Sequence, residues 1–128
     1  MLFRSEGAFR VIVTAFAAGD REKLRPLLTA DTMAAFEGAI AAREAAGETQ
    51  RTEIRAILEA TIEAAALRGS QAEITVRFVS QQVSLTLGKD GQILAGADAV
   101  TEIVDVWVFV RDLAQAGAVW RLAAAHSA

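Results

Sequence analysis

The sequence contains no cysteine and no tyrosine, and it has a single histidine and a single proline. Without cysteine, the chain has no disulfide framework, no thiolate zinc site and no cysteine nucleophile. The lone histidine, His126, is third from the C-terminal end, where we expect a solvated side chain, because a metal site needs three or four ligands. Side chains for acid–base chemistry and metal binding are therefore scarce, and we predict neither a metal nor a cofactor.

Long hydrophobic runs are also missing, because no stretch reaches the ~18 apolar residues that a membrane-spanning helix needs. Hydrophobic residues nevertheless make up 53% of the 128 residues, which excludes a disordered chain and leaves room for one domain with a real core. The formal net charge is −3 and the sequence pI is about 5.1. A nucleic-acid-binding domain normally has a basic stripe and a high pI, so nucleic acid is excluded as a partner.

The first third of the chain has the periodicity of helices. Four apolar residues recur at spacing i, i+3, i+4, i+7 and share one helical face: Phe9, Ile12, Val13 and Phe16. We predict that Gly19 ends this helix and that Asp20 caps a second, short one. A third, alanine-rich helix follows a cap at Thr29 or Asp31 and is expected to run to Gly47.

Alternating apolar and polar residues predict a long strand over residues 72–87. Its apolar side chains switch from even to odd positions, so we predict a β-bulge between Val79 and Gln82 that bends the strand. This strand needs a partner, and we assign residues 61–67 to it, although isoleucines at helical spacing from residue 54 onward favour a helix.

The C-terminal part continues the strand pattern. We predict a turn at Asp90-Gly91, a loop over residues 95–99, a strand over residues 101–113 and a last strand over residues 118–124. Three helices followed by four strands joined by short turns indicate an α+β domain, with the helices packed on one face of a curved antiparallel sheet. The strands are apolar on both faces, so the second face must meet a pocket, a partner or a second copy of the chain.

At this point the sequence resembles a known family, the Tim44-like domains of the mitochondrial inner-membrane import-motor tether and of its alphaproteobacterial relatives. The resemblance covers nearly the whole chain, and its most specific piece is the strand with Asp105, Trp107 and Phe109 at alternate positions. The other matching pieces are residues 16–20, 24–28, 76–80 and 120–122 and the helix around Phe36.

This resemblance implies a nuclear-transport-factor-two-like fold, whose cone-shaped sheet surrounds an apolar pocket. It also implies peripheral association with the bacterial inner membrane through lipid head groups, and a role near protein translocation. Full-length bacterial relatives carry an N-terminal membrane segment and a polar linker, so we expect residues 1–128 to be a single domain from the C-terminal part of a longer, membrane-anchored protein.

Asp105 is the most suggestive single residue, because it shares a strand face with Ile103 and Trp107. A carboxylate in an apolar pocket can act as a general base, with a pKa raised by desolvation. The alternative is a cross-strand ion pair with Arg77 or Arg121. We favour the ion pair, because a catalytic pocket usually offers a second acid–base group, and the chain has no tyrosine and no second histidine.

Two further groups are candidates for binding. Basic residues around the start of the second helix can contact lipid phosphates or form an ordinary solvated face; they are Arg10, Arg21, Lys23 and Arg25. Aromatic residues at strand spacing, together with Asp105, are candidates for lining a pocket, although a role in the core is the commoner one; they are Phe78, Trp107, Phe109 and Trp120.

The sequence therefore predicts a non-enzymatic adaptor domain at the inner membrane that contacts anionic lipids and translocation machinery or client proteins. Two alternatives remain open. One is a domain that binds a small molecule, or a lyase- or isomerase-type enzyme that uses Asp105. The other is a structural module that forms a homodimer through the spare apolar face of the sheet.

Overall fold

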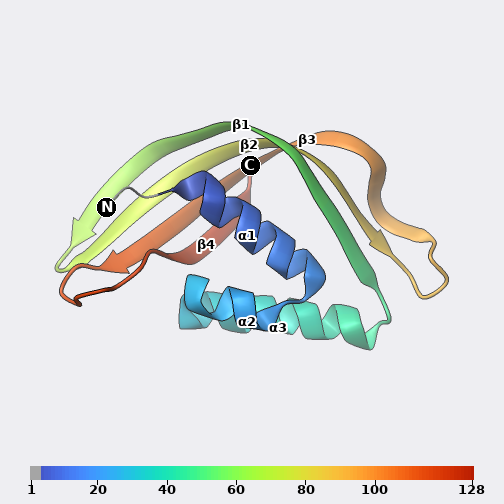
Figure 1. Ribbon diagram of the computed structural model, residues 1–128, viewed down its shortest axis with the longest axis horizontal. Helices are drawn as coiled ribbons and strands as arrows, with labels where there is room; N and C mark the ends of the chain where they lie inside the picture. The colour runs from blue at the N-terminus through green and yellow to red at the C-terminus, as the bar shows by residue number, and fades with distance from the viewer. Residues whose placement is uncertain (1–3) are drawn as a thin grey trace.

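Residues 4–128 are described by a computed structural model. A curved antiparallel sheet arches over helices that all lie on its concave side (Figure 1). The strands pair in chain order and are β1 (Thr49–Arg68), β2 (Gln71–Leu87), β3 (Ile93–Asp112) and β4 (Arg121–Ser127). The helices are α1 (Ser5–Ala18), α2 (Arg21–Leu24), the 3₁₀ turn η1 (Arg25–Leu27) and α3 (Ala30–Ala45). The α+β class, the helix and strand order and the curved four-stranded sheet are those predicted from the sequence.

The predicted ends of the helices follow from local chemistry. Gly19 adopts the left-handed conformation that ends α1, with φ of 70°. The Asp20 carboxylate accepts a hydrogen bond of 3.2 Å from the backbone N–H of Lys23 and so caps α2. Of the two caps considered for the third helix, Thr29 is the one used, because its hydroxyl accepts from the backbone N–H of Thr32 at 3.4 Å.

The strand assigned to residues 61–67 is confirmed, but β1 is much longer and begins at Thr49. Its apolar residues have helical spacing because extra residues are inserted between Ile54 and Ala56 and between Ile57 and Glu59, where the pairing with β2 shifts. Each extra residue turns a side-chain step of two into a step of three. Ile54, Ile57 and Ala60 therefore all pack against the core although the chain between them is extended.

The β-bulge predicted within β2, between Val79 and Gln82, is on the wrong strand. β2 pairs with β3 without a break from Gln71 to Gln82, and the irregularities at this level belong to β1. The even-numbered side chains of β2 therefore stay on one face of the sheet from Gln71 to Gln82, and the apolar pattern changes because residues on both faces are buried. Phe78 and Gln82 lie on the helix side, and Val79 and Val83 are also buried at odd positions.

Two predicted boundaries in the C-terminal part are also wrong. Residues 95–99 are not a loop but belong to β3. Gln82 pairs with Thr101 and Ser84 pairs with Ala97, so the three residues 98–100 of β3 lie opposite the single residue Val83 of β2 and form a bulge. The last strand begins three residues later than predicted, at Arg121. Residues 95–99 are rich in alanine and exposed, so their sequence carries little apolar alternation from which a strand can be recognised. Residues 118–120 are apolar, which favours a strand, but they are not part of the ladder with β3, which begins at Arg121.

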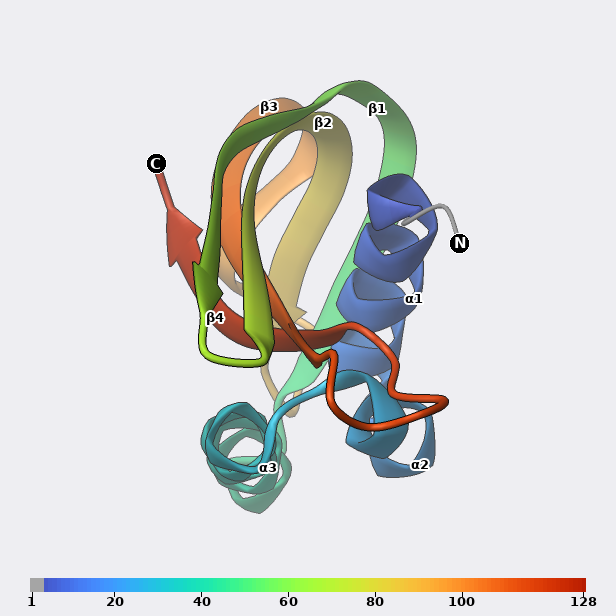
Figure 2. The same ribbon diagram turned by 90° about the vertical axis from the view of Figure 1, so that its left-hand side faces the viewer.

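The core fills the space between the helices and the concave face of the sheet. The Phe9 ring of α1 stacks on Phe78 with a centroid distance of 4.4 Å and lies 4.7 Å from Trp107. Leu122 is fully buried beside them. The other buried hydrophobic residues of this cluster are Ile12, Ala15, Leu24, Leu28, Ile40, Val76 and Phe109. Seen from the end of the sheet, the strands curl around α1 (Figure 2).

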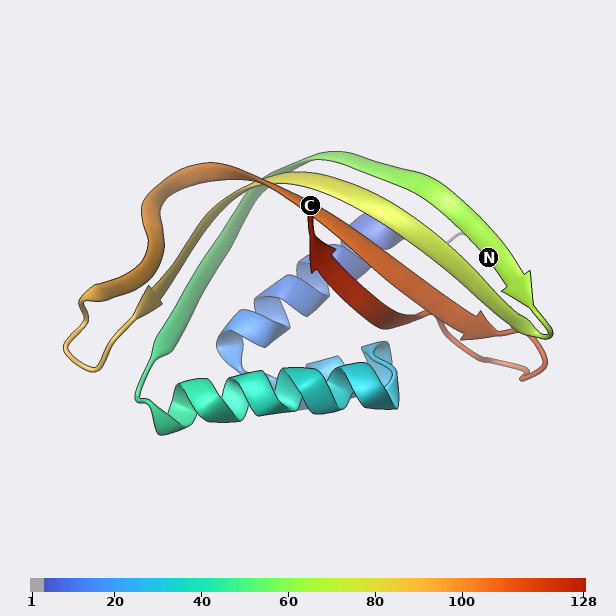
Figure 3. The ribbon, with the colours of Figure 1, turned by 180° about the vertical axis from the view of Figure 1, so that it is seen from behind.

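α3 crosses below the open side of the sheet and is held at both ends (Figure 3). At its start, the Thr32 hydroxyl donates to the carbonyl of Ala123 in β4 at 2.9 Å. Near its end, Arg43 donates to the carbonyl of Phe16 at 2.8 Å, and its guanidinium lies 5.3 Å from the centre of the Phe16 ring. These contacts hold α3 beside the end of α1 and leave space between the helices and the sheet.

Candidate functional site

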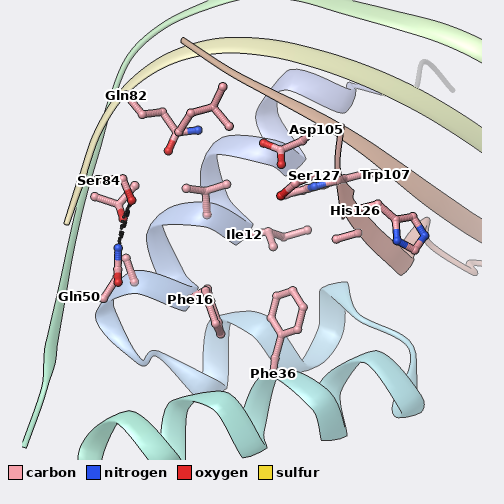
Figure 4. A pocket seen from close by; sticks show the side chains of 15 residues that line it. Ile12, Phe16, Phe36, Gln50, Gln82, Ser84, Asp105, Trp107, His126 and Ser127 are labelled. Atoms are coloured by element: carbon pink, nitrogen blue, oxygen red, sulfur yellow. Dashed lines mark hydrogen bonds between the residues drawn. The ribbon is translucent and has the colours of Figure 1, made fainter. Parts of the chain in front are cut away.

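A pocket of about 390 Å³ lies between α1, α3 and the concave face of the sheet (Figure 4). This volume is in the range of small-ligand sites. Two chemically different groups of side chains line it. The apolar group is Ile12, Val13, Phe16, Ala17, Phe36, Ile103, Trp107 and Ala125. The polar group is Gln50, Thr52, Gln82, Ser84, Asp105, His126 and Ser127.

The aromatic side of the pocket is held by the core behind it. The rings of Phe16 and Phe36 lie 4.8 Å apart and bring together α1 and α3. Trp107 is 5% exposed and packs with an edge contact against Phe78, with ring centroids 5.4 Å apart. The Trp107 ring is thus fixed by a residue that does not line the pocket, and the two phenylalanine rings fix each other, so the aromatic surface is preorganised.

The opposite side of the pocket carries a network of uncharged polar side chains. The Gln50 amide nitrogen donates to Thr52 and to Ser84, each at 3.1 Å, and its oxygen accepts from Thr86 at 2.8 Å. Gln82 is 4% exposed and donates to the buried Ser80 hydroxyl at 2.9 Å. Sequence reasoning missed this wall, although its signal is present: the even positions of β2 change from Val76 and Phe78 to Ser80, Gln82 and Ser84.

Asp105 faces this pocket from the middle of the sheet. In the sheet register, Phe78 of β2 lies on one side of it and Ser127 of β4 on the other. Among residues 4–128, no side chain forms a hydrogen bond or an ion pair with its carboxylate. Burial without a partner raises the pKa of Asp105 above its ordinary value, because the charged form loses hydration.

The cross-strand ion pair that we favoured for Asp105 is therefore wrong, and the register gives the reason. Arg77 pairs with Val106, so its side chain emerges on the other face of the sheet, where it forms an ion pair with Glu59. Arg121 lies opposite Val110, five residues farther along β3. Neither arginine reaches the carboxylate, and Asp105 is left as the acidic group of the pocket.

His126 and Ser127 also line the pocket, from the last strand. Both side chains are exposed, so the pocket reaches the surface on this side. In the part of the chain that the structure describes, no three histidine, cysteine or acidic side chains come together as metal ligands would. His126 is solvated, as expected from its position, and at the same time contributes a polar group to the pocket.

The aromatic residues predicted as pocket-lining candidates separate into two groups. Trp107 lines the pocket together with Asp105. Phe78 and Phe109 are 0% and 1% exposed and belong to the core beneath it. Trp120 is partly buried and packs against the same core just before β4 begins.

The basic candidates for lipid contact do not form one cluster. Arg21 bridges α2 to α3, because its guanidinium forms ion pairs with Glu37 at 2.6 Å and with Glu44 at 2.8 Å. These carboxylates raise the pKa of Arg21, and the contact with Arg21 lowers the pKa of Glu44. Arg25 forms an ion pair with Glu22 at 2.7 Å.

The other two basic candidates lie together on a different surface. Arg10 and Lys23 line one shallow hollow beside Val11 and Thr14. Lys23 lies 3.9 Å from the Asp20 carboxylate, and Arg10 has no ion-pair partner among residues 4–128. Within that range, no helix is both long enough and apolar enough to cross a membrane.

Comparison with known proteins identifies the family. The family model for the Tim44-like domain matches residues 2–127, which is nearly the whole chain. The chain belongs to the Tim44-like domain family. The resemblance inferred from the sequence is thereby confirmed, and membership connects this domain with membranes and with protein translocation.

One solved structure extends the comparison to the fold. The intermembrane-space region of the chloroplast protein ARC6 superimposes on this Tim44-like domain with a TM-score of 0.62, covering 99% of this chain and 98% of the other. The two sequences are 8% identical, so this likeness concerns the fold alone. No curated protein sequence matches the chain.

Proposed function

We propose that this Tim44-like domain is a non-enzymatic adaptor that lies peripherally on the inner membrane and holds a segment of a client or translocation protein in the pocket around Asp105. The observation that carries the proposal is the unpaired Asp105 carboxylate in a pocket walled by three aromatic rings. Family membership supports the connection with protein translocation.

The chemistry of the pocket favours a basic side chain as its occupant. A cation near Asp105 would restore the electrostatic partner that the carboxylate lacks, and aromatic faces attract cations as well. The rings of Phe16, Phe36 and Trp107 also suit the aliphatic stem of a lysine or an arginine. The polar wall around Gln50 and Ser84 can hydrogen-bond to the backbone of the same segment.

Lipid contact is proposed for the exposed side of α1 and the start of α2. Arg10 and Lys23 carry the positive charge, and Val11, which lines the same hollow, is 44% exposed. Each basic residue near an anionic surface contributes about 1 kcal/mol, so two of them give weak, salt-sensitive binding. Arg21 and Arg25 already have acidic partners and are expected to contribute less.

Peptide binding tests the client proposal. We would titrate the domain with a fluorescent peptide that carries one arginine between apolar residues, and with the same peptide in which citrulline replaces that arginine. Wild-type protein should prefer the arginine peptide at least tenfold, and Asp105→Asn should abolish that preference. Asp98→Asn is the matched control, since Asp98 is an exposed carboxylate on the same strand. Equal binding of both peptides would overturn the proposal.

Vesicle flotation tests the lipid proposal separately. The domain should float with cardiolipin-containing vesicles at low salt, and not at high salt or with phosphatidylcholine alone. The pair Arg10→Gln and Lys23→Gln should lose this binding, while Arg25→Gln should keep it. If Arg25→Gln has the same effect as the pair, net charge rather than this surface is responsible.

A small-molecule enzyme is the second candidate, because burial raises the pKa of Asp105 toward the range of a general base. In an isomerisation the carboxylate would take the proton of a substrate C–H and return it to another carbon of the same molecule, with no co-reactant. Proton–deuterium exchange into carbonyl compounds that bind the pocket would support this function. Its absence for every binding compound, with peptide binding intact, would leave the adaptor.

The homodimer also stays a prediction. Apolar side chains of β1 are 54–65% exposed, namely Leu58, Ile62 and Leu67. Sedimentation of a monomer at high protein concentration would exclude a dimer formed through this strand.

A further inference from the structure

β3 has a free edge along its first half. β4 pairs with β3 only from Asp105 to Val110, whereas β3 begins at Ile93. The last contact on this side is the backbone N–H of Ala128, which donates to the carbonyl of Val104 at 2.9 Å. Among residues 4–128, no strand pairs with β3 from Ile93 to Val104 on the side away from β2, and Figure 3 shows β3 continuing past the end of β4.

The outer strands of the sheet, β1 and β4, have edges of a different kind. The chain before and within α3 covers the outer edge of β4: the N–H of Thr29 donates to the carbonyl of Leu122 at 3.0 Å, and the Thr32 hydroxyl donates to the carbonyl of Ala123. β1 has no neighbouring strand on its outer side among the described residues, but it carries three arginines and three glutamates and is therefore neutral.

The free edge of β3, in contrast, is acidic. From Ile93 to Asp105 the strand carries no basic side chain and three acidic ones, which are Asp98, Glu102 and Asp105. Asp105 faces the pocket, and Glu102 lies opposite Gln81 on the other face of the sheet. Because side chains alternate between the two faces of a strand, negative charge is present on both faces of this edge.

The same edge also exposes apolar side chains. Every residue from 93 to 102 is exposed, and three large apolar side chains among them are 51–53% exposed, namely Ile93, Leu94 and Val100. An exposed edge with unpaired N–H and C=O groups is a template for another extended chain. Charge decides between the two kinds of chain, since a second copy would place an equally acidic edge against this one, whereas a basic segment is attracted to it.

The free edge leads into the pocket around Asp105. Ile103 belongs to this edge and lines the pocket, and Ser127 lines it from the end of β4. Asp105 and Ser127 are paired in the sheet register and lie side by side in Figure 4. A chain that lies along the free edge therefore passes the side of the pocket that reaches the surface.

We propose that a basic, extended segment of a partner protein adds to the sheet beside β3, along the free edge from Ile93 to Val104. The backbone of this segment forms hydrogen bonds with β3, and its side chains alternate between the two faces of the sheet. One basic side chain meets Asp105 on the pocket face and another meets Glu102 on the opposite face, so the two lie three residues apart in the segment. This inference rests on the proposed client function and adds how the client segment is held.

Backbone N-methylation tests the added strand. The probe is a fluorescent peptide with two arginines three residues apart among apolar residues, together with two isomers that are N-methylated at its odd or at its even residues. Alternate N–H groups of a strand point to opposite edges, so one isomer should bind like the parent peptide and the other at least tenfold more weakly. Equal affinities of the two isomers, both strong or both weak, overturn the added strand.

Hydrogen exchange measured by NMR then locates the peptide. The Glu102 N–H points to the same edge as the Val104 carbonyl, because the two residues are two positions apart, and it should exchange at least tenfold more slowly in the complex. Amides of β1 should be unchanged. Slowing on β1 instead of Glu102 overturns the proposal, and so does slowing of Glu102 at high protein concentration without peptide, which would place a second copy on this edge.

Charge reversal tests which part of the edge attracts the peptide. Glu102→Lys should weaken binding at least tenfold, while Glu63→Lys, the same change at an exposed position of β1, should leave it unchanged. Glu102 is also exposed, so its substitution leaves the fold intact, and an unchanged spectrum elsewhere verifies this. An equal loss in both variants shows that net charge is responsible and overturns the proposal.

The client pocket can fail separately from the free edge. If the two N-methylated isomers bind equally while Asp105→Asn still abolishes the preference for arginine over citrulline, the added strand is wrong and the client pocket stands. If the isomers differ and Asp105→Asn has no effect, the added strand stands and the pairing with Asp105 is wrong.

Discussion

Truncation of Phe9 is the sharpest test of how the helices are held against the sheet. The Phe9 side chain is fully buried, and it is the residue of α1 whose ring contacts both Phe78 and Trp107, at 4.4 and 4.7 Å. Replacing a buried phenylalanine by alanine costs about 3–5 kcal/mol, and each aromatic pair contributes about 0.5–1.5 kcal/mol beyond burial. We therefore expect Phe9→Ala to lower the free energy of unfolding by about 5 kcal/mol.

This loss is large for a domain of 128 residues. Natural domains are stable by about 5–15 kcal/mol, so Phe9→Ala should leave the protein close to unfolding at 37 °C. With an unfolding entropy of about 2.1 cal/mol/K per residue, the melting temperature should fall by roughly 15–20 °C. Phe9→Leu keeps most of the volume and should cost less than half as much.

Urea denaturation followed by tryptophan fluorescence gives the measurement. Val11→Ala is the control, since Val11 lies on the same helix, is 44% exposed, and should change stability by less than about 0.5 kcal/mol. The slope of the unfolding transition should stay constant across the three variants. If Phe9→Ala costs no more than Val11→Ala, α1 does not anchor on the sheet as described.

Three further predictions follow from single residues. Burial raises the pKa of Asp105, so the folded state binds the proton of this carboxyl more tightly than the unfolded state does. The free energy of unfolding of the wild type should therefore decline as pH rises from about 4 through the pKa that Asp105 has in the folded state. Urea titrations at several pH values measure this decline, which Asp105→Asn should lack. Gly96→Ala should lower the free energy of unfolding by at least about 2 kcal/mol, because a Cβ at this position would lie 2.2 Å from the carbonyl oxygen of Ser84. Gly91 has a similar positive φ but open space around it, so Gly91→Ala should lower it by about 1 kcal/mol; thermal unfolding measures both. Arg21→Gln should lower the melting temperature at low salt and much less at high salt, since it breaks two ion pairs between α2 and α3; a salt-independent loss would contradict this reasoning.

The helices were predictable because their signals are local. Spacing of apolar residues within α1, a glycine after its last turn, and side chains that cap α2 and α3 all act within a few residues of the chain. The start of β1 was not predictable in the same way. Ile54 and Ile57 are three residues apart on one face only because an extra residue intervenes in a strand, and this is decided by pairing with β2.

The candidate site was likewise predictable only where the signal lies within one strand. Alternation along β3 is enough to place Asp105 and Trp107 on one face of a strand, and both residues line the pocket. What alternation left undecided was the partner of Asp105, since two arginines were available at plausible positions. The register excludes both, because a shift of one residue moves a side chain to the opposite face of a sheet.

Composition and local periodicity thus predicted a small α+β domain without cysteine chemistry, and the resemblance along the chain indicated its family. Only the tertiary structure decided which polar residues meet: Gln50 and Ser84 across β1 and β2, and Asp105 beside the end of β4. It also left the edge of β3 from Ile93 to Val104 without a neighbouring strand among residues 4–128. Periodicity records which way a side chain faces along its own element, whereas contacts between residues far apart in sequence depend on strand register and on where the helices pack.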